Sequence, residues 1–314
     1  MTDTTCPGGL GSIGGRAVAR IGYGAMQLGD AGSPDDAVAV LRRAVELGIN
    51  HLDTASFYGG GTVSTLIRQA LRPYRDDLVI VSKVGAVHVP DGPAPLAAAQ
   101  KPAELRAAVE ADLKQLGLEQ IPVVNLRRLD LGPGLRAARD QLVGIDDQLA
   151  EMTALRDEGK IGAIGLSAVP ADTVRHALPA GITCVQNAYS VLDRSQEDTL
   201  RLCAEEGVAW VPFFPLGSAF PGFPSVTANP SVRTVAERIG ATPAQVGLAW
   251  LLAHSPNTLL IAGTRSVTHL EDNAAAGAIQ LDAEALATLD PIGTVPADNT
   301  VHQHGAEPHL LEND

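Results

Sequence analysis

Short runs of β-branched and aliphatic residues alternate with longer amphipathic segments along the chain from about residue 20 onward. Such a run is typical of a buried strand, and apolar residues three and four positions apart are typical of a helix that packs on one. Regular alternation of the two predicts parallel strands joined by crossover helices. The predicted strands are residues 20–23, 49–53, 78–83, 123–126, 161–166, 183–186, 208–213 and 258–261.

The number of repeats and the even composition indicate how these strands are arranged. Eight β/α repeats without a linker-like change in composition favour a closed barrel over two doubly wound halves. We therefore expect an α/β fold, a (β/α)8 TIM barrel in which residues 1–314 form one domain. The glycine-rich residues 8–18 are expected to form an N-terminal β-hairpin, residues 85–100 and 215–230 to form long loops, and residues from about 293 to form an irregular tail.

Helix boundaries carry signals of their own. Ser33 before Pro34 is typical of an N-cap followed by a first-turn proline, and Gly48 is typical of the residue after a helix. Thr242 with Gln245 three residues later predicts a capping box. The apolar stripes predicted for two helices are Ala37, Val40, Leu41, Ala44 and Val45, and Leu105, Ala108, Val109, Leu113 and Leu116 before Gly117.

A glycine pattern near the N-terminus has the residue spacing of a dinucleotide-binding fingerprint but lacks the sequence context of one. Residues 9–14 read Gly-Leu-Gly-Ser-Ile-Gly, but polar residues and a proline precede them where the fingerprint requires a buried strand. We interpret these glycines as turn residues of the expected hairpin.

Composition narrows the class of protein. The 45% hydrophobic and 19% charged residues indicate a globular chain with a large core. A net charge of −13 disfavours nucleic acid and anionic membranes as partners. Without a signal-peptide pattern, a long apolar span or a disulfide-type cysteine pattern, we expect a cytoplasmic protein. His302, His304 and His309 lack an accompanying carboxylate or cysteine framework, so no metal is expected.

Three chemistry-bearing residues fall at or just after predicted strand ends. Asp53 ends the second strand, Lys83 ends the third, and Tyr58 follows Asp53 by five residues. Barrel active sites gather at the C-terminal ends of the strands, so these three side chains are expected to converge. In this order and spacing, His51-Leu52-Asp53-Thr54-Ala55, Phe57-Tyr58-Gly59 and Val81-Ser82-Lys83 resemble the aldo-keto reductase superfamily.

The resemblance implies a catalytic tetrad of Asp, Tyr, Lys and His, of which Asp53, Tyr58 and Lys83 supply the first three. Tyrosine has an ordinary pKa of about 10, so proton donation near neutral pH needs a nearby cation such as Lys83 to stabilise the phenolate. Asp53 would hold that ammonium in place. Taken singly, the three residues also fit a helix cap, a packed loop aromatic and a lysine extending from a strand end.

The fourth tetrad position departs from the family pattern. Residues 123–130 read Val-Val-Asn-Leu-Arg-Arg-Leu-Asp, which puts Arg127 where the family has histidine. An arginine cannot act as a neutral acid–base partner, but its guanidinium can donate hydrogen bonds to a developing oxyanion. We expect activity to survive; the alternatives are a structural ion-pair role for Arg127 or crippled catalysis.

Further motifs resemble one subgroup of that superfamily. Residues 22–28 (Gly-Tyr-Gly-Ala-Met-Gln-Leu), 125–127 (Asn-Leu-Arg) and 213–217 (Phe-Phe-Pro-Leu-Gly) look like the bacterial pyridoxal reductase-type enzymes. This resemblance implies NADPH-dependent reduction of pyridoxal to pyridoxine, within the broader reduction of a small aldehyde or ketone. Ala25 and Met26 then fall, with Asp53, among the expected cofactor contacts.

The remaining expected NADP contacts also come from the resemblance. Ser167 and Gln186 match carboxamide-binding positions, although Ala168 replaces the usual asparagine, and Phe213 matches an aromatic that stacks on nicotinamide. After the eighth strand, a helix N-terminus is expected to bind the 2′-phosphate beside Arg265. The other residues assigned to the cofactor are Leu216, Ser218, Gly263, Thr264, His269, Asp272 and Asn273.

Two other readings of function remain open. The altered tetrad also fits a non-catalytic NADP-binding regulatory protein, although retention of Asp53, Tyr58 and Lys83 favours an enzyme. Within enzymes, the substrate could instead be a sugar or a secondary-metabolite ketone, with Phe220, Phe223 and His88 shaping the pocket. No sequence pattern indicates the oligomeric state.

Overall fold

Eight parallel strands form the central sheet of the protein, in the order β11-β10-β9-β8-β5-β4-β3-β12. The structure is a computed structural model that describes residues 6–30, 33–90, 92, 94–131, 134–217 and 224–293. Each predicted strand corresponds to one strand of this sheet. The strands are β3 (Ile21–Gly24), β4 (His51–Asp53), β5 (Val79–Val84), β8 (Ile121–Arg127), β9 (Ile161–Ser167), β10 (Ile182–Gln186), β11 (Ala209–Trp210) and β12 (Leu260–Ala262).

The sheet closes on itself, because its two outer strands are joined. The amide of Trp210 in β11 donates to the Asn257 carbonyl at 3.0 Å, and the amide of Leu259 donates to the Trp210 carbonyl at 2.8 Å. These bonds form a parallel bridge between Trp210 and Thr258, just before β12. The closed (β/α)8 ring expected from the sequence is therefore confirmed.

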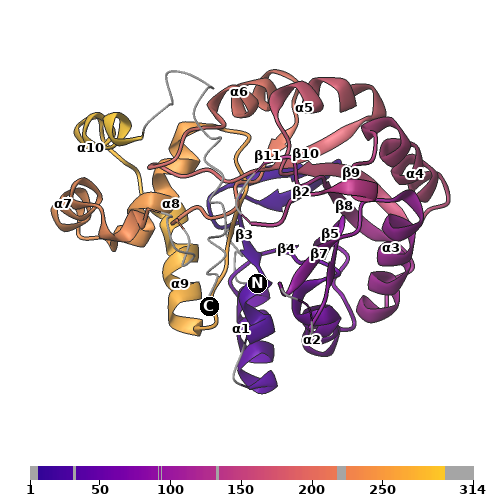
Figure 1. The fold of residues 1–314 in the computed structure, drawn as a ribbon. Helices are drawn as coiled ribbons and strands as arrows, with labels where there is room; N and C mark the ends of the chain where they lie inside the picture. The colour runs from indigo at the N-terminus through magenta and orange to yellow at the C-terminus, as the bar shows by residue number, and fades with distance from the viewer. Residues whose placement is uncertain are drawn as a thin grey trace, which may run out of the picture.

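Helices surround this ring of strands (Figure 1). Most of them follow one strand and return the chain to the start of the next, as the alternation predicts. The α-helices are α1 (Pro34–Glu46), α2 (Thr62–Leu71), α3 (Pro102–Leu116), α4 (Ile145–Asp157), α5 (Ala171–Ala177), α6 (Glu197–Glu205), α7 (Pro230–Ile239), α8 (Pro243–His254), α9 (Val267–Ala275) and α10 (Ala283–Leu289). Short 3₁₀ helices are η1 (Met26–Asp30), η2 (Tyr58–Gly61), η3 (Arg139–Gln141), η4 (Leu178–Ala180), η5 (Val226–Ala228), η6 (Ala276–Ala278) and η7 (Asp290–Ile292).

The predicted caps are present at the helix ends. The Ser33 side chain accepts a hydrogen bond from the amide of Asp35 at the start of α1, and Gly117 adopts the left-handed conformation after α3. Thr242 and Gln245 form the reciprocal capping box at the start of α8. Local side chains thus satisfy backbone groups that a helix leaves unpaired.

The glycine-rich N-terminal segment forms the predicted hairpin. Strands β1 (Leu10–Ile13) and β2 (Arg16–Ala19) pair antiparallel across Gly14 and Gly15, both at positive φ. Ile13 and Val18 pack into one apolar cluster with side chains from the barrel interior. The hairpin therefore covers one opening of the barrel, and its glycines serve a turn.

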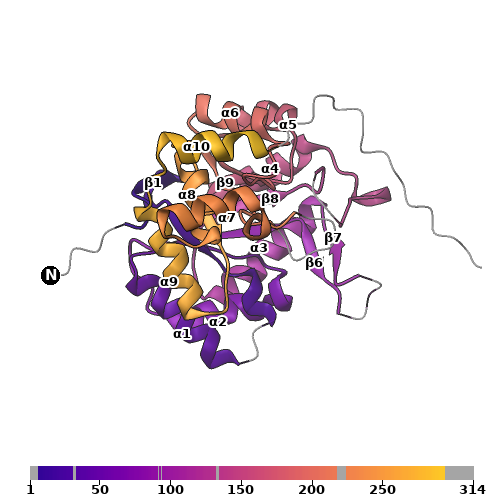
Figure 2. The same cartoon turned by 90° about the vertical axis from the view of Figure 1, so that its left-hand side faces the viewer.

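Two expectations about strand extent were wrong. Residues 85–100 were predicted to be a loop, but they contain a hairpin of β6 (Ala86–His88) and β7 (Leu96–Ala98). This hairpin lies at the opposite end of the molecule from β1 (Figure 2). The seventh predicted strand, residues 208–213, is shorter, because regular pairing ends at Trp210 and Phe213 joins its neighbour through a single bridge to Ala188.

Several expectations concern residues outside the described part of the chain. These are the tail beyond residue 293 and Ser218, Phe220, Phe223, His302, His304 and His309. Within the described part, none of the helices combines the length and apolar character needed to cross a membrane.

The barrel interior changes from apolar to polar along its axis. Next to the N-terminal hairpin it contains aliphatic side chains such as Val123 and Ala163. One layer further, the Cys184 thiol donates to Asn125 Oδ1 at 3.1 Å. Gly165 lies between them, and a Cβ there would stand 2.0 Å from Asn125 Oδ1 and 2.4 Å from Cys184 Sγ.

Replacement of Gly165 by alanine is expected to destabilise the fold by about 1–3 kcal/mol, because the barrel interior has no room for the added methyl group. The midpoint of urea unfolding measures this change. Gly144→Ala is the matched control, since its Cβ would meet just one atom, Asp147 Oδ2 at 3.7 Å. Equal stability of the two variants would contradict the tight packing at Gly165.

Candidate active site

A buried ion pair lies at the polar end of the barrel interior. Lys83 Nζ donates to Asp53 Oδ1, and both side chains are almost wholly buried, at 5% and 3% exposure. Strand register brings them together, because β4 and β5 pair in parallel and put Asp53 beside Val81, two residues before Lys83. The structure therefore brings together Asp53 and Lys83, the first two of the three residues that the sequence predicted to converge.

Two further polar groups complete this pair. Lys83 Nζ also donates to the Thr54 carbonyl at 3.0 Å, and Gln186 Nε2 donates to Asp53 Oδ2 at 2.6 Å. Both carboxylate oxygens and the ammonium thus have partners, as buried charges require. Gln186 was predicted as a carboxamide-binding residue, and its contact with Asp53 was missed.

Tyr58 lies directly beside the ammonium. Lys83 Nζ lies 5.1 Å from the centroid of the Tyr58 ring, which packs edge-on against Phe57 with the ring centroids 5.3 Å apart. Tyr58 begins η2, and the chain turns after it through Gly59 and Gly60 at positive φ. The turn holds the half-buried phenol over the pair.

Electrostatics keep Lys83 charged in this buried position. Burial lowers its pKa, but the Asp53 carboxylate and the Tyr58 hydroxyl outweigh that effect, and the net pKa is raised above its ordinary value. Asp53 acts both as a nearby charge and as a hydrogen-bond acceptor, and Tyr58 also acts as a hydrogen-bond partner. The ammonium is therefore available to stabilise negative charge on the phenol oxygen.

Arg127 ends β8 at the same rim. Its guanidinium carbon lies 5.8 Å from the Phe57 ring centroid. Burial lowers the pKa of Arg127, and the Tyr58 hydroxyl acts in the opposite direction. The predicted fourth member of the tetrad thus lies against Phe57, the ring that packs on Tyr58, and comes from another strand than Lys83.

The β6–β7 hairpin forms a wall beside this group. Ala86 and Leu96 pack in one cluster with Phe57 and Tyr58. His88 lies close to the Tyr58 loop, because a Cβ on Gly60 would stand 3.2 Å from His88 Nδ1. The segment predicted as a loop therefore borders the site through paired strands.

Three of the expected cofactor residues lie at the ends of β9, β10 and beyond β11. Ser167 is buried, and Gln186 Oε1 is buried without a hydrogen-bond partner in the described part of the chain. Phe213 packs against the interior cluster and lies edge-on to Phe214 at 5.0 Å between ring centroids. Ala168, where the family pattern has asparagine, adopts a positive φ of 57°.

A second group of expected cofactor residues surrounds the start of α9. Ser266 caps this helix by accepting from the amide of His269, and Thr264 Oγ1 accepts from the amide of Ser266 at 3.1 Å. Arg265 and His269 are exposed, and Asn273 is buried. The helix N-terminus expected after the eighth strand is present, and helix N-termini of this kind bind anions.

The other expected contacts are spread around the rim. The amide of Ala25 donates to the Asp53 carbonyl at 2.8 Å, which ties β3 to the ion pair. Met26 is 42% exposed in η1, and Leu216 packs partly buried against the core. The backbone of Asp272 accepts from Gln245 Nε2 at 3.1 Å, and Gly263 lies against the Gly24 carbonyl.

His51 is a buried polar residue to which the sequence assigned no role of its own. Its side chain faces the barrel interior two residues before Asp53, and neither ring nitrogen has a hydrogen-bond partner among the described residues. Burial lowers the pKa of His51 to about 4, with Asp53 raising it and Lys83 lowering it. The alternation of the strand, which puts residues 51 and 53 on one face, was the available signal.

Comparison with known proteins covers nearly the whole chain. The profile of the aldo/keto reductase family matches residues 20–293. Pyridoxine 4-dehydrogenase of Escherichia coli (strain K12) is 45% identical over 288 residues, which cover 90% of this chain and 97% of that protein.

Solved structures show the same likeness. An aldo/keto reductase from Klebsiella pneumoniae in complex with NADP and acetate gives a TM-score of 0.76 at 27% identity, covering 92% of this chain and 96% of that one. An aldo-keto reductase from Klebsiella pneumoniae in complex with NADPH gives 0.77 at 26% identity, covering 93% and 97%.

Burial of neutral His51 is expected to make the protein less stable in acid. Between pH 6.5 and about 4 the unfolded chain binds a proton at this histidine that the folded chain does not, so stability falls as pH falls. The full effect is about 3 kcal/mol, at roughly 1.4 kcal/mol per pKa unit. Denaturant unfolding at a series of pH values measures it.

The comparison that isolates this effect is wild type against His51→Leu. The variant is expected to lose less stability across the same pH range, because the leucine cannot take up a proton in either state. The same replacement at the exposed His269 is the control and is expected to keep the wild-type slope. Parallel curves for wild type and His51→Leu would contradict the prediction.

Proposed function

The chain belongs to the aldo/keto reductase family, and we propose that within it the protein uses NADPH to reduce a small aldehyde, with Tyr58 as the proton donor. Like other members of the family, it is an NAD(P)-dependent oxidoreductase acting on carbonyl compounds. The observation that carries the proposal is the buried Lys83–Asp53 pair beside the Tyr58 ring.

Residues around the barrel mouth fit a nicotinamide cofactor. Gln186 Oε1 is a buried acceptor without a partner among the described residues, and a carboxamide could donate to it. Phe213 would pack against the nicotinamide ring, and the start of α9 with Arg265 would hold the adenosine phosphate. Relatives in complex with NADP and NADPH support this choice of cofactor. When bound, the cofactor supplies the hydride.

The chain's own residues would manage the proton. Transfer of hydride to the carbonyl carbon leaves negative charge on the oxygen, and Tyr58 would protonate that oxygen. Lys83 would stabilise the phenolate that remains, and Asp53 would keep the ammonium oriented. Arg127 would add a second cation near Tyr58, against the neighbouring Phe57 ring.

Pyridoxal is the substrate that the relatives support best. The Escherichia coli relative is named pyridoxine 4-dehydrogenase, and the reverse of that reaction reduces pyridoxal to pyridoxine. That relative is 45% identical over 90% of the chain, and the family profile, over residues 20–293, spans every strand that contributes to the site. The intact ion pair favours an enzyme over a regulatory binding protein.

Tyr58→Phe is expected to lower kcat for pyridoxal by about 10²- to 10⁴-fold, because it removes the proton donor. Loss of NADPH absorbance measures the rate with pyridoxal and a panel of other aldehydes, and NADPH fluorescence measures binding, which the variant should retain. Tyr74→Phe is the matched control, since the Tyr74 hydroxyl donates to the Leu116 carbonyl. An unchanged rate in Tyr58→Phe would rule out this proton donor, and no reaction with any aldehyde would rule out the reductase.

Arg265→Gln is expected to raise KM for NADPH by roughly 10- to 100-fold and to leave KM for NADH unchanged, because a charge-assisted contact to the 2′-phosphate is lost. Steady-state kinetics with both cofactors measure this difference. Arg175→Gln, on the exposed face of α5, is the control. An equal effect on NADH, or equal use of both cofactors by wild type, would contradict the role of Arg265.

A further inference from the structure

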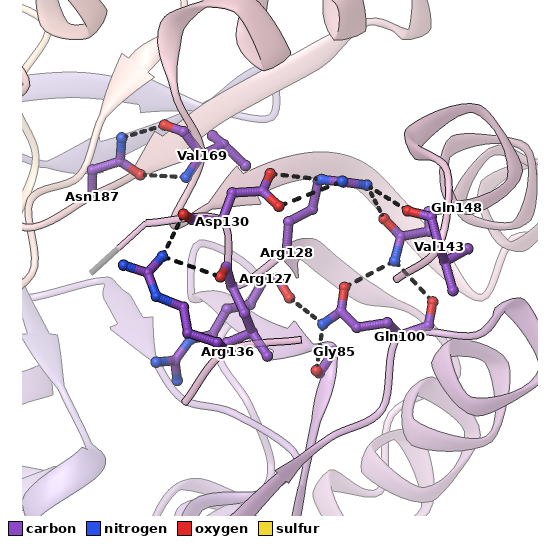
Figure 3. A network of polar contacts seen from close by, with 11 residues as sticks. Gly85, Gln100, Arg127, Arg128, Asp130, Arg136, Val143, Gln148, Val169 and Asn187 are labelled. Carbon is purple, nitrogen blue, oxygen red and sulfur yellow. Dashed lines mark hydrogen bonds and ion pairs between the residues drawn. The ribbon is translucent and has the colours of Figure 1, made fainter. Parts of the chain in front are cut away.

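Arg127, Arg128 and Arg136 lie at or near the end of β8, and of these three Arg128 pairs with the carboxylate of Asp130. Asp130 accepts from Arg128, with Nε to Oδ2 at 2.8 Å, and Arg128 Nη1 also donates to Gln148 Oε1 at 2.5 Å. Arg136 donates to the backbone carbonyls of Leu129 and Asp130. Figure 3 shows these contacts and shows the Arg127 guanidinium apart from them. The Asp130 carboxylate, three residues after Arg127, therefore pairs with Arg128.

Arg127 has no carboxylate partner among the described residues. Its contacts are the face of Phe57 and the electrostatic interaction with Tyr58. A structural ion-pair role for Arg127 would need a carboxylate partner. Asp130, three residues further along the chain, is paired with Arg128 instead. A partly buried cation without an anion is costly, and a bound anion would relieve that cost.

The backbone of Arg127 is nevertheless held firmly. Gln100 Nε2 donates to the Arg127 carbonyl at 2.8 Å and to the Gly85 carbonyl at 2.6 Å. Gln148 Nε2 in turn donates to the Gln100 carbonyl at 2.8 Å and to Gln100 Oε1 at 2.9 Å. This network, drawn in Figure 3, fixes the strand end without using the guanidinium. The guanidinium lies against the Phe57 ring, next to Tyr58, and takes no part in this network.

We propose that Arg127 binds an anionic oxygen of the substrate itself, carried on the ring carbon next to the one that bears the reacting carbonyl. The preferred substrates are then ortho-hydroxyaryl aldehydes in their phenolate form, the class to which pyridoxal belongs. This inference rests on the proposed function, because it takes Tyr58 as the group that meets the carbonyl oxygen.

The ortho position follows from the arrangement of Arg127 and Tyr58. Lys83 Nζ lies 5.1 Å from the Tyr58 ring centroid, and the guanidinium carbon of Arg127 lies 5.8 Å from the centroid of the adjacent Phe57 ring. The two cations therefore border neighbouring rings beside the point where the carbonyl oxygen would bind. An anion that meets Arg127 while the carbonyl meets Tyr58 must be close to that carbonyl. A planar guanidinium can then bridge the two oxygens with its parallel donors.

Matched aldehydes test the inference. The probes are 3-hydroxypyridine-4-carbaldehyde, its 3-methoxy ether and pyridine-4-carbaldehyde, which differ at the ortho position alone. Wild type is expected to show a kcat/KM about 10- to 100-fold higher for the hydroxy compound than for the other two, as a charge-assisted contact provides. In Arg127→Met the kcat/KM values for the three aldehydes should lie within about threefold of one another. Arg127→Lys keeps the charge without the planar donors, so its ratio should lie between those of wild type and Arg127→Met.

Arg136→Met is the control, because it removes another arginine of the same segment and should leave the ratio unchanged. Circular dichroism of each variant confirms folding. Equal kcat/KM for the three aldehydes in wild type, or an unchanged ratio in Arg127→Met, would overturn the inference and leave the reductase standing. Failure of all aldehydes to oxidise NADPH would instead remove the proposed function.

A binding measurement tests Arg127 independently of turnover. The absorption spectrum of a 3-hydroxypyridine changes when its hydroxyl ionises, so titration with 3-hydroxypyridine-4-methanol reports the form that binds. Wild type is expected to bind the phenolate and shift the spectrum, and Arg127→Met is expected to lose the shift. A spectrum that does not change, or that changes equally in both proteins, would overturn the inference even if no aldehyde were reduced.

Discussion

The candidate site depends on a lysine ammonium that stays charged inside a barrel. Taking a cation out of water costs several kcal/mol unless an anion and further hydrogen bonds replace the solvent. Here Asp53 and the Thr54 carbonyl provide that replacement around Lys83, and the Gln186 amide donates to the other oxygen of Asp53. Their convergence brings the neighbouring strands β4 and β5 together with β10, which β9 and β8 separate from β5 in the sheet, so the electrostatics of the site depend on the curvature and closure of the sheet.

Glycines make room for the polar layer beneath this pair. Gly22 leaves space for the buried His51 ring, since a Cβ there would stand 2.8 Å from His51 Nδ1. Gly165 does the same for Asn125 and Cys184. The interior is therefore filled by alternating large and small residues on adjacent strands, as packing a narrow barrel requires. This close packing beneath the ion pair is expected to limit how far the Lys83 and Asp53 side chains can move.

The sequence predicted what local patterns control. Strands, caps and the residues at strand ends follow from periodicity and from signals such as Ser33 and Thr242, and the structure has them. The sequence did not predict which distant side chains bond to each other, because the residues of such a pair can be far apart in the chain. Gln186 and Asp53, for example, are 133 residues apart. The β6–β7 hairpin was also missed, since proline and glycine in residues 85–100 indicate turns and its strands are three residues each. Its partners Phe57 and Tyr58 come from another loop.

The balance of charge around Tyr58 is compatible with an arginine at the position where the general family pattern predicts histidine. With a neutral imidazole at that place, Lys83 and Asp53 would cancel, and the phenol would sit beside a balanced pair. Arg127 adds one positive charge that no carboxylate of the described residues offsets. Both a phenolate on Tyr58 and an anionic oxygen on a substrate would restore neutrality. The uncompensated positive charge that would ease proton release from Tyr58 would therefore also favour substrates with a negative charge next to the carbonyl. Proton donation and substrate preference would then share one electrostatic cause.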